Sequence, residues 1–153
     1  MKILYAFSIF LCLLITACDN DSSNTTAATD NLDLSIGTAT NCSASHSNVG
    51  KSAIFSTFQH GVTGTVTIID DCTIEITGFS YDGGGPQVYI YAGTDGDYVS
   101  SNAFQFSKLL SGISFSNNTI QLIIPDNKTL DDFNSLSVWC VDFNANFGDV
   151  IFN

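Results

Sequence analysis

The stretch HGVTGTVTIIDDCTIEITGF, residues 60–79, decides the fold because its apolar and polar side chains alternate with the period of a β-strand. In residues 62–68 a valine, glycine or isoleucine occupies every second position, with threonines between them. Residues 73–77 repeat the alternation, with Ile74 and Ile76 on one side and polar residues on the other. The intervening DDC is typical of a turn. These residues predict a β-hairpin with one apolar face.

The rest of the chain continues in short strands. Apolar runs separated by turn signals are QVYIYAG at 87–93, NTIQLIIP at 118–125, SVWCVDF at 137–143 and FGDVIF at 147–152. Residues 104–110 could form a short helix or an irregular strand, and residues 129–134 suit a single helical turn capped by Thr129, with Asp132 three residues on. The sequence therefore predicts an all-β fold, an antiparallel β-sandwich of about 7–8 short strands.

The first 17 residues, MKILYAFSIFLCLLITA, have the pattern of a secretory signal peptide. Lys2 precedes an apolar run that is too short to span a bilayer and ends in small residues. ITAC at 15–18 resembles a bacterial lipobox. This resemblance implies cleavage before Cys18, a diacylglycerol on its sulfur and usually a third acyl chain, such as palmitate, on its amine. The alternative is an ordinary secreted protein with an unmodified Cys18.

We expect residues 18–48 to be a lipidated cysteine followed by a flexible tether. Residues 49–153 are expected to form the folded domain. The tether is rich in Ser, Thr, Asn and Asp and has few large apolar groups, so it cannot offset the entropy cost of ordering. We expect a protein of the cell envelope, anchored to a membrane and facing the periplasm or the cell exterior. Asp19 and Asp21 do not settle which membrane carries it.

The charge balance restricts the partners. The chain has 15 Asp and Glu residues against four Lys and Arg, for a net charge of -11. Nucleic acid and anionic lipid head groups are therefore poor partners.

Three cysteines remain after Cys12 leaves with the signal peptide and Cys18 takes lipid. In a compartment that permits disulfides, Cys42, Cys72 and Cys140 most simply form one pair and one free thiol, and the sequence alone leaves three connectivities open. We expect Cys42 to pair with Cys72, since one ends the tether and the other lies at the hairpin turn. This bond would fasten the N-terminal edge of the domain.

Three motifs make residues 50–152 similar to the DM-thirteen domain: HGVTG at 60–64, FSYDGGGP at 79–86, and SVWC followed by NFGDV between 137 and 150. Domains of this family are extracytoplasmic, accompany DOMON domains in Skeletor-type proteins and occur alone in bacterial lipoproteins. The resemblance implies a β-sandwich with a proposed redox or electron-transfer role. It identifies Cys140 as the cysteine of VWC and His60 as the histidine of HGVxG, whereas Cys42 and Cys72 are not part of the pattern.

Cys140 has several interpretations. Alternation places Trp139, Val141 and Phe143 on one face of the strand, which we expect in the core, and leaves Cys140 on the opposite, more polar face. The nearby Asp142 does not favour a reactive thiolate, which argues against a hydrolase-type or peroxidatic nucleophile. The thiol is then a redox or cofactor-ligand residue, a small hydrophobe, or a disulfide partner.

A haem or another redox metal would take its ligands mainly from His60 and Cys140, since the single methionine leaves with the signal peptide. No CxxCH attachment motif and no CxxC pair is present in the sequence, so no motif supports a haem, and thioredoxin-like chemistry is disfavoured. The alternative role of His60 is that of a hydrogen-bonded structural residue.

The segment SYDGGGPQVYIYAGTDGDY, residues 80–98, contains a candidate ligand rim made of Tyr81, Asp82, Tyr89 and Tyr91. Tyrosines could stack on a sugar, and Asp82, Asp95 and Asp97 could hold calcium, although their spacing matches no complete calcium loop. The alternative is a tight turn flanked by ordinary strand aromatics.

Two functions follow from the sequence. The first is a lipid-anchored extracytoplasmic domain with a redox or electron-transfer role centred on Cys140 and a redox protein as its partner. The second is a non-catalytic binding module for a glycan or a protein. Either makes the domain an accessory rather than a stand-alone enzyme. A Cys140 thiol that lies in a cleft near His60 would favour the redox role. A thiol buried away from water beneath a rim of tyrosines would favour the binding module.

Overall fold

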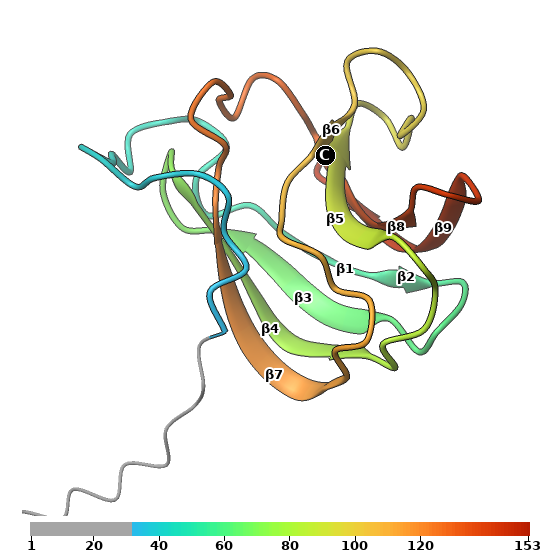
Figure 1. The fold of residues 1–153 in the computed structure, drawn as a ribbon. Helices are drawn as coiled ribbons and strands as arrows, with labels where there is room; N and C mark the ends of the chain where they lie inside the picture. The colour runs from blue at the N-terminus through green and yellow to red at the C-terminus, as the bar shows by residue number, and fades with distance from the viewer. Residues whose placement is uncertain (1–31) are drawn as a thin grey trace, which may run out of the picture.

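The computed structural model describes residues 32–153, which form two facing β-sheets (Figure 1). The strands are β1 (Ser52–Ile54), β2 (Ser56–Thr57), β3 (Thr63–Ile68), β4 (Thr73–Tyr81), β5 (Val88–Gly93), β6 (Phe104–Gln105), β7 (Phe115–Ile123), β8 (Ser135–Cys140) and β9 (Ala145–Ile151). An antiparallel four-stranded sheet has the order β1-β3-β4-β7, and a five-stranded sheet has the order β2-β9-β8-β5-β6. The predicted all-β sandwich is confirmed, with nine strands in this part of the chain.

The predicted hairpin forms β3 and β4. Val66 lies opposite Ile76 and Ile68 opposite Ile74, and all four side chains are buried between the sheets. The polar residues between them face away from the core, as the alternation predicts. The hairpin therefore supplies the central strands of the four-stranded sheet.

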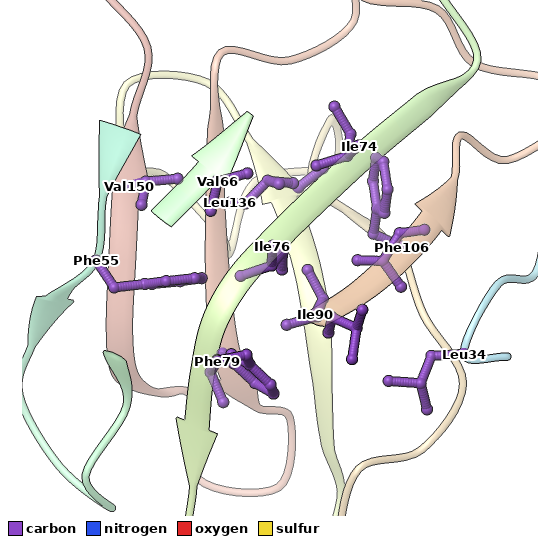
Figure 2. Packing of buried hydrophobic residues seen from close by; sticks show 14 of the residues in the cluster. Leu34, Phe55, Val66, Ile74, Ile76, Phe79, Ile90, Phe106, Leu136 and Val150 are labelled. Atoms are coloured by element: carbon purple, nitrogen blue, oxygen red, sulfur yellow. The ribbon is translucent and has the colours of Figure 1, made fainter. Parts of the chain in front are cut away.

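Phenylalanine rings pack together in the core, where Figure 2 labels Phe55 and Phe79. The ring of Phe79 in β4 lies 5.0 Å from that of Phe115 in β7 and 6.3 Å from that of Phe55, measured between centroids. Phe55 is the single residue between β1 and β2, where the chain passes from one sheet to the other. These three rings therefore join both sheets at the crossing point of the chain.

Two segments that suit helices in the sequence are not helical. Residues 104–110 contain β6 and an irregular stretch in which Ser107 forms an isolated bridge with Ser35. The Asp132 carboxylate accepts hydrogen bonds from the Thr129 N–H at 2.7 Å and hydroxyl at 3.0 Å, as a capping pair would. With the Asp132 N–H to Thr129 carbonyl bond at 3.1 Å, these contacts form one capped turn shortly before β8, so the predicted capping pair is present but no helix forms.

The folded part begins before residue 49. Leu34 is buried in the core, and its carbonyl accepts a hydrogen bond from the Lys108 N–H at 2.7 Å. The Lys108 ammonium lies 3.0 Å from the Asp33 carboxylate. Residues 33–48 thus form an arm attached to the domain, which corrects the predicted tether boundary at residue 48, because an apolar anchor precedes the polar stretch.

The predicted signal peptide at residues 1–17 and the predicted lipid attachment at Cys18 lie outside the described residues. Within residues 32–153, no helix is long and apolar enough to cross a membrane.

Candidate functional site

Cys140 is the last residue of β8, the middle strand of the five-stranded sheet. It pairs with Val88 of β5 and Ala145 of β9. Its side chain is 0% exposed and belongs to the core together with those of Leu136 and Val138. The expectation that the thiol lies on the more polar face of the strand is therefore wrong.

The expectation fails because β8 is covered by other side chains on both of its faces. Trp139 points away from Cys140 and is buried as well, because Tyr98 from the loop after β5 packs on it with a centroid distance of 5.6 Å. Since β8 ends at Cys140, Phe143 does not continue its alternation and is 72% exposed in the turn before β9. A strand buried on both faces offers no polar side by which alternation could identify its core face.

The three cysteines of the described part divide as expected. Cys42 and Cys72 form a disulfide with their Cα atoms 5.5 Å apart, which confirms the predicted pair. Cys140 is the free cysteine among the described residues. Cys140, the cysteine of the VWC motif, is therefore the one of the three that forms no disulfide.

Tyr81, the last residue of β4, belongs to the same buried core as Cys140 and lines a depression at the surface. Its ring is almost completely buried, and its hydroxyl donates a hydrogen bond to the carbonyl of Gly84. Burial raises the pKa of Tyr81 to about 12, and the charges of Asp82 and Cys140 add to the rise. The phenol is therefore protonated at neutral pH.

His60 and Asp82 form the polar edge of the site. His60 Nδ1 lies 3.0 and 3.1 Å from the two carboxylate oxygens of Asp82, and the Asp82 N–H donates to the His60 carbonyl at 3.1 Å. The Gly84 N–H, at 2.7 Å, and then His60 lower the pKa of Asp82. The His60 ring packs on Phe147 with a centroid distance of 4.2 Å. The imidazole is thus held in one orientation and is 29% exposed.

The glycine run in the loop after β4 permits this packing. A Cβ atom added to Gly84 would lie only 2.5 Å from His60 Nδ1, so a larger residue would displace the imidazole. Phe147, which supports the other side of the ring, was not a predicted site residue. It lies within the NFGDV motif, but its apolar character resembles that of any core residue in a strand.

A shallow depression brings three predicted site residues together. Its lining consists of His60, Gly61, Ser80, Tyr81, Asp82, Ser114 and Phe115. Cys140 does not line it and is fully buried, so the thiol does not face His60 across this depression. Tyr81 lines the depression and belongs to the same buried core as Cys140.

The predicted tyrosine rim is not assembled. Tyr89 and Tyr91 lie on the face of β5 turned away from the core, half-buried and paired in register with Trp139 and Ser137 of β8. Tyr81 belongs to the other sheet and points inward. The four rim residues therefore divide between two separate surfaces.

Within residues 32–153, His60 and Cys140 do not come together as a haem or copper site. A carboxylate on Nδ1 is the usual support of a histidine that binds metal through Nε2, and His60 has this support. Cys140 is closed off in the core and does not complete a ligand set with it. The group of metal-donor side chains found among residues 32–153 lies elsewhere, at Cys42, Asp70, Asp71 and Cys72, and does not include the suggested calcium ligands.

Fold and site together define a small β-sandwich domain with one buried free thiol, a neighbouring tyrosine and a surface histidine supported by a carboxylate. Residues 54–152 match the family described as Electron transfer DM13. The chain belongs to this family, as the resemblance of its three motifs predicts.

Two relatives indicate the settings in which similar domains occur. Isoforms B/C of the protein Skeletor from Drosophila melanogaster are 37% identical over 97 residues, which are 60% of this chain and 12% of the relative. The cytochrome b561, DM13 and DOMON domain-containing protein of Arabidopsis thaliana is 27% identical over 112 residues, which are 72% of this chain and 12% of the relative. The match thus covers only 12% of the length of each of these relatives. No solved structure matches the chain.

Proposed function

We propose that this protein is a lipid-anchored extracytoplasmic electron-transfer domain. Cys140 is its redox centre, and the depression over His60 and Tyr81 faces the redox partner. The observation that carries the proposal is a free thiol in the middle of a sheet, in the same buried core as a tyrosine that lines a surface depression. Membership of the DM13 electron-transfer family supports a redox role.

The burial of Cys140 determines the kind of redox chemistry. A fully buried sulfur does not exchange disulfides with a partner, because exchange requires one sulfur to attack another directly. An electron can cross a short stretch of packed protein without such contact. One-electron oxidation of the thiol releases an electron and a proton and leaves a thiyl radical, and the return of both restores the thiol.

A haem protein suits the role of electron donor. The name of the Arabidopsis relative combines a cytochrome b561 with a DM13 domain in one protein. We infer that a reduced haem returns the electron to oxidised Cys140, and that a strong one-electron oxidant removes it. Because the chain carries a net charge of -11, a basic docking surface on the partner would speed the encounter.

Replacing Cys140 by valine tests the redox centre. Valine is similar in size but has no sulfur, so we expect the stability to change by less than about 1.5 kcal/mol. The one-electron wave in protein-film voltammetry of the purified protein should disappear. The Cys42–Cys72 disulfide is unchanged in this variant, so it serves as the internal control for other sulfur signals. A one-electron wave of undiminished size in the Cys140→Val protein would refute the assignment.

A non-catalytic binding module is the second candidate, and the dry position of Cys140 is the observation that favours it. Its predicted tyrosine rim is divided between the sheets, so the depression at His60 and Asp82 is the surface that would bind a protein or glycan. The Cys140→Val variant separates the two functions, because a binding module keeps its ligand without the sulfur.

The lipid anchor has its own test. We expect Cys18→Ser to abolish metabolic labelling with a radioactive fatty acid and to leave the uncleaved precursor, because both modification and cleavage depend on this cysteine in the lipobox that residues 15–18 resemble. Immunoblots of membrane fractions would measure precursor size and location. Normal processing and fractionation of the variant would show that Cys18 is not the attachment site.

A further inference from the structure

The disulfide that fastens the N-terminal arm has two aspartates beside it. Cys42 comes from the arm, and Asp70, Asp71 and Cys72 form the turn between β3 and β4. One ligand atom from each of these four residues lies within 4.8 Å of the other three. They share no residue with the Cys140 site or with the depression.

Hydrogen bonds hold the two sides of this group together independently of the disulfide. The Ser43 N–H donates to Asp71 Oδ1 at 2.6 Å, and the Asp71 N–H donates to the Ser43 carbonyl at 2.9 Å. The burial of Leu34 anchors the arm a second time. The four side chains therefore stay close to one another when the sulfur–sulfur bond is broken.

The two carboxylates are already oriented. The Cys72 N–H donates to Asp70 Oδ1 at 2.9 Å, while Asp71 uses its own Oδ1 for Ser43. The Cys72 sulfur lies 3.6 Å from Asp71 Oδ1, and each aspartate has a carboxylate oxygen within 4.8 Å of both sulfurs. Hydrogen bonds to one oxygen of a carboxylate that fix the other are the usual support of a metal ligand.

Reduction adds two free sulfurs to the two carboxylates of this group. Cys42 is exposed, so a reducing dithiol can reach the disulfide. Two thiols would then lie beside two carboxylates, and the ion pairs within residues 32–153 involve other carboxylates. The carboxylates keep the thiols protonated until a divalent cation replaces the protons.

We propose that reduction converts the Cys42–Cys72 disulfide into a Zn²⁺ site whose ligands are the two sulfurs and one carboxylate oxygen each of Asp70 and Asp71. A protein dithiol exchanges with the disulfide, becoming a disulfide itself and leaving two thiols here. Zn²⁺ then displaces both thiol protons to solvent. Two thiolates and two carboxylates are suitable ligands for tetrahedral zinc. The arm stays fastened to the domain in both redox states, by a bond in one and by a metal in the other.

The test titrates Co²⁺ and then Zn²⁺ into the purified protein after reduction with a phosphine and anaerobic removal of the reductant. Co²⁺ reports a tetrahedral thiolate site by intense visible d–d bands and by a sulfur-to-metal charge-transfer band, which one equivalent of Zn²⁺ should abolish. Cys140→Val removes the remaining thiol of the described residues and should leave the spectrum unchanged. Oxidised protein should give no thiolate band.

Isosteric variants identify the carboxylates. Because loss even of an outer ligand partner costs about 10–100-fold in affinity, Asp70→Asn and Asp71→Asn should each weaken Zn²⁺ binding by at least about tenfold. Asp142→Asn, at an exposed aspartate in the turn before β9, is the matched control and should bind as wild type does.

Three results would overturn the proposal. They are the lack of a tetrahedral spectrum in reduced protein, equal affinity in the two asparagine variants and wild type, and unfolding on reduction in the near-ultraviolet circular dichroism of Trp139. None of them bears on the Cys140 electron-transfer function, which the valine variant tests separately.

Discussion

Replacing Phe79 by alanine is expected to lower the free energy of unfolding by about 3–5 kcal/mol, the usual cost of deleting a buried phenylalanine ring. Phe79 is 0% exposed, and its ring packs on those of Phe55 and Phe115. The cavity would open where the chain crosses from one sheet to the other, so neither sheet can close over it without moving the crossing. Urea denaturation followed by the fluorescence of Trp139 measures the loss.

Phe143→Ala is the matched control, because it removes the same side chain from a position that is 72% exposed. We expect its free energy of unfolding to stay within about 0.5 kcal/mol of wild type. Equal losses in the two variants would contradict the assignment of Phe79 to the core and of Phe143 to the surface. The two variants also test the finding that Phe143, in the turn after β8, does not continue the alternation of that strand.

The hairpin of β3 and β4 was predictable because it obeys one local rule. One face of its sheet is turned away from the core, so threonines and isoleucines separate cleanly with a period of two. The buried pairs Val66–Ile76 and Ile68–Ile74 follow from that pattern and from the position of the DDC turn. The sandwich class follows in turn from the number and spacing of such strands.

The orientation of Cys140 was not predictable from its own strand. All six residues of β8 are buried, including Ser135 and Ser137, so polarity does not mark a solvent face. The cover over Trp139 comes from Tyr98, which lies 41 residues earlier in the chain and in another element. Local alternation contains no information about such cover, and the larger side chain was therefore assigned to the core.

In the candidate site, too, some features were predictable from the sequence and others were not. His60 was recognisable from the HGVTG motif, and Asp82 from the neighbouring glycine run. Their pairing depends on the turn before β3, where His60 adopts a positive φ of 54° and its carbonyl accepts the Asp82 N–H. Tyr89 and Tyr91 share a sequence segment with Tyr81 but belong to the opposite sheet. Proximity in sequence suggested one rim, whereas the assignment of strands to sheets made two surfaces.

The arm was assigned to the tether because its composition is that of a flexible segment. Thr, Ser and Asn dominate residues 38–48, and a single buried side chain, Leu34, lies just before them. The contacts that fix the arm are the Cys42–Cys72 disulfide and the hydrogen bonds between Ser43 and Asp71. The sequence predicted the Cys42–Cys72 pair but not that the residues around Cys42 are held against the domain.

Removing the disulfide by the paired replacement Cys42→Ser and Cys72→Ser is expected to lower the free energy of unfolding by about 3–4 kcal/mol. The bond joins residues 30 apart in sequence, and its loss frees the unfolded chain from that loop. Serine is tolerated in the folded state because Cys42 is exposed and Cys72 is half-buried. Urea denaturation in the presence of a metal chelator measures the effect.

Cys140→Val serves as the control for a change at a cysteine outside the bond, and its denaturation midpoint should shift far less. Limited proteolysis supplies a second measurement, because cleavage within residues 33–48 should become faster in the paired variant, while cleavage elsewhere in the domain should not. Unchanged stability and unchanged protection of the arm would mean that the Ser43–Asp71 hydrogen bonds and the burial of Leu34 already hold it in place. The loop entropy of the unfolded chain would then contribute nothing, and the bond would matter only as the oxidised state of the proposed zinc ligands.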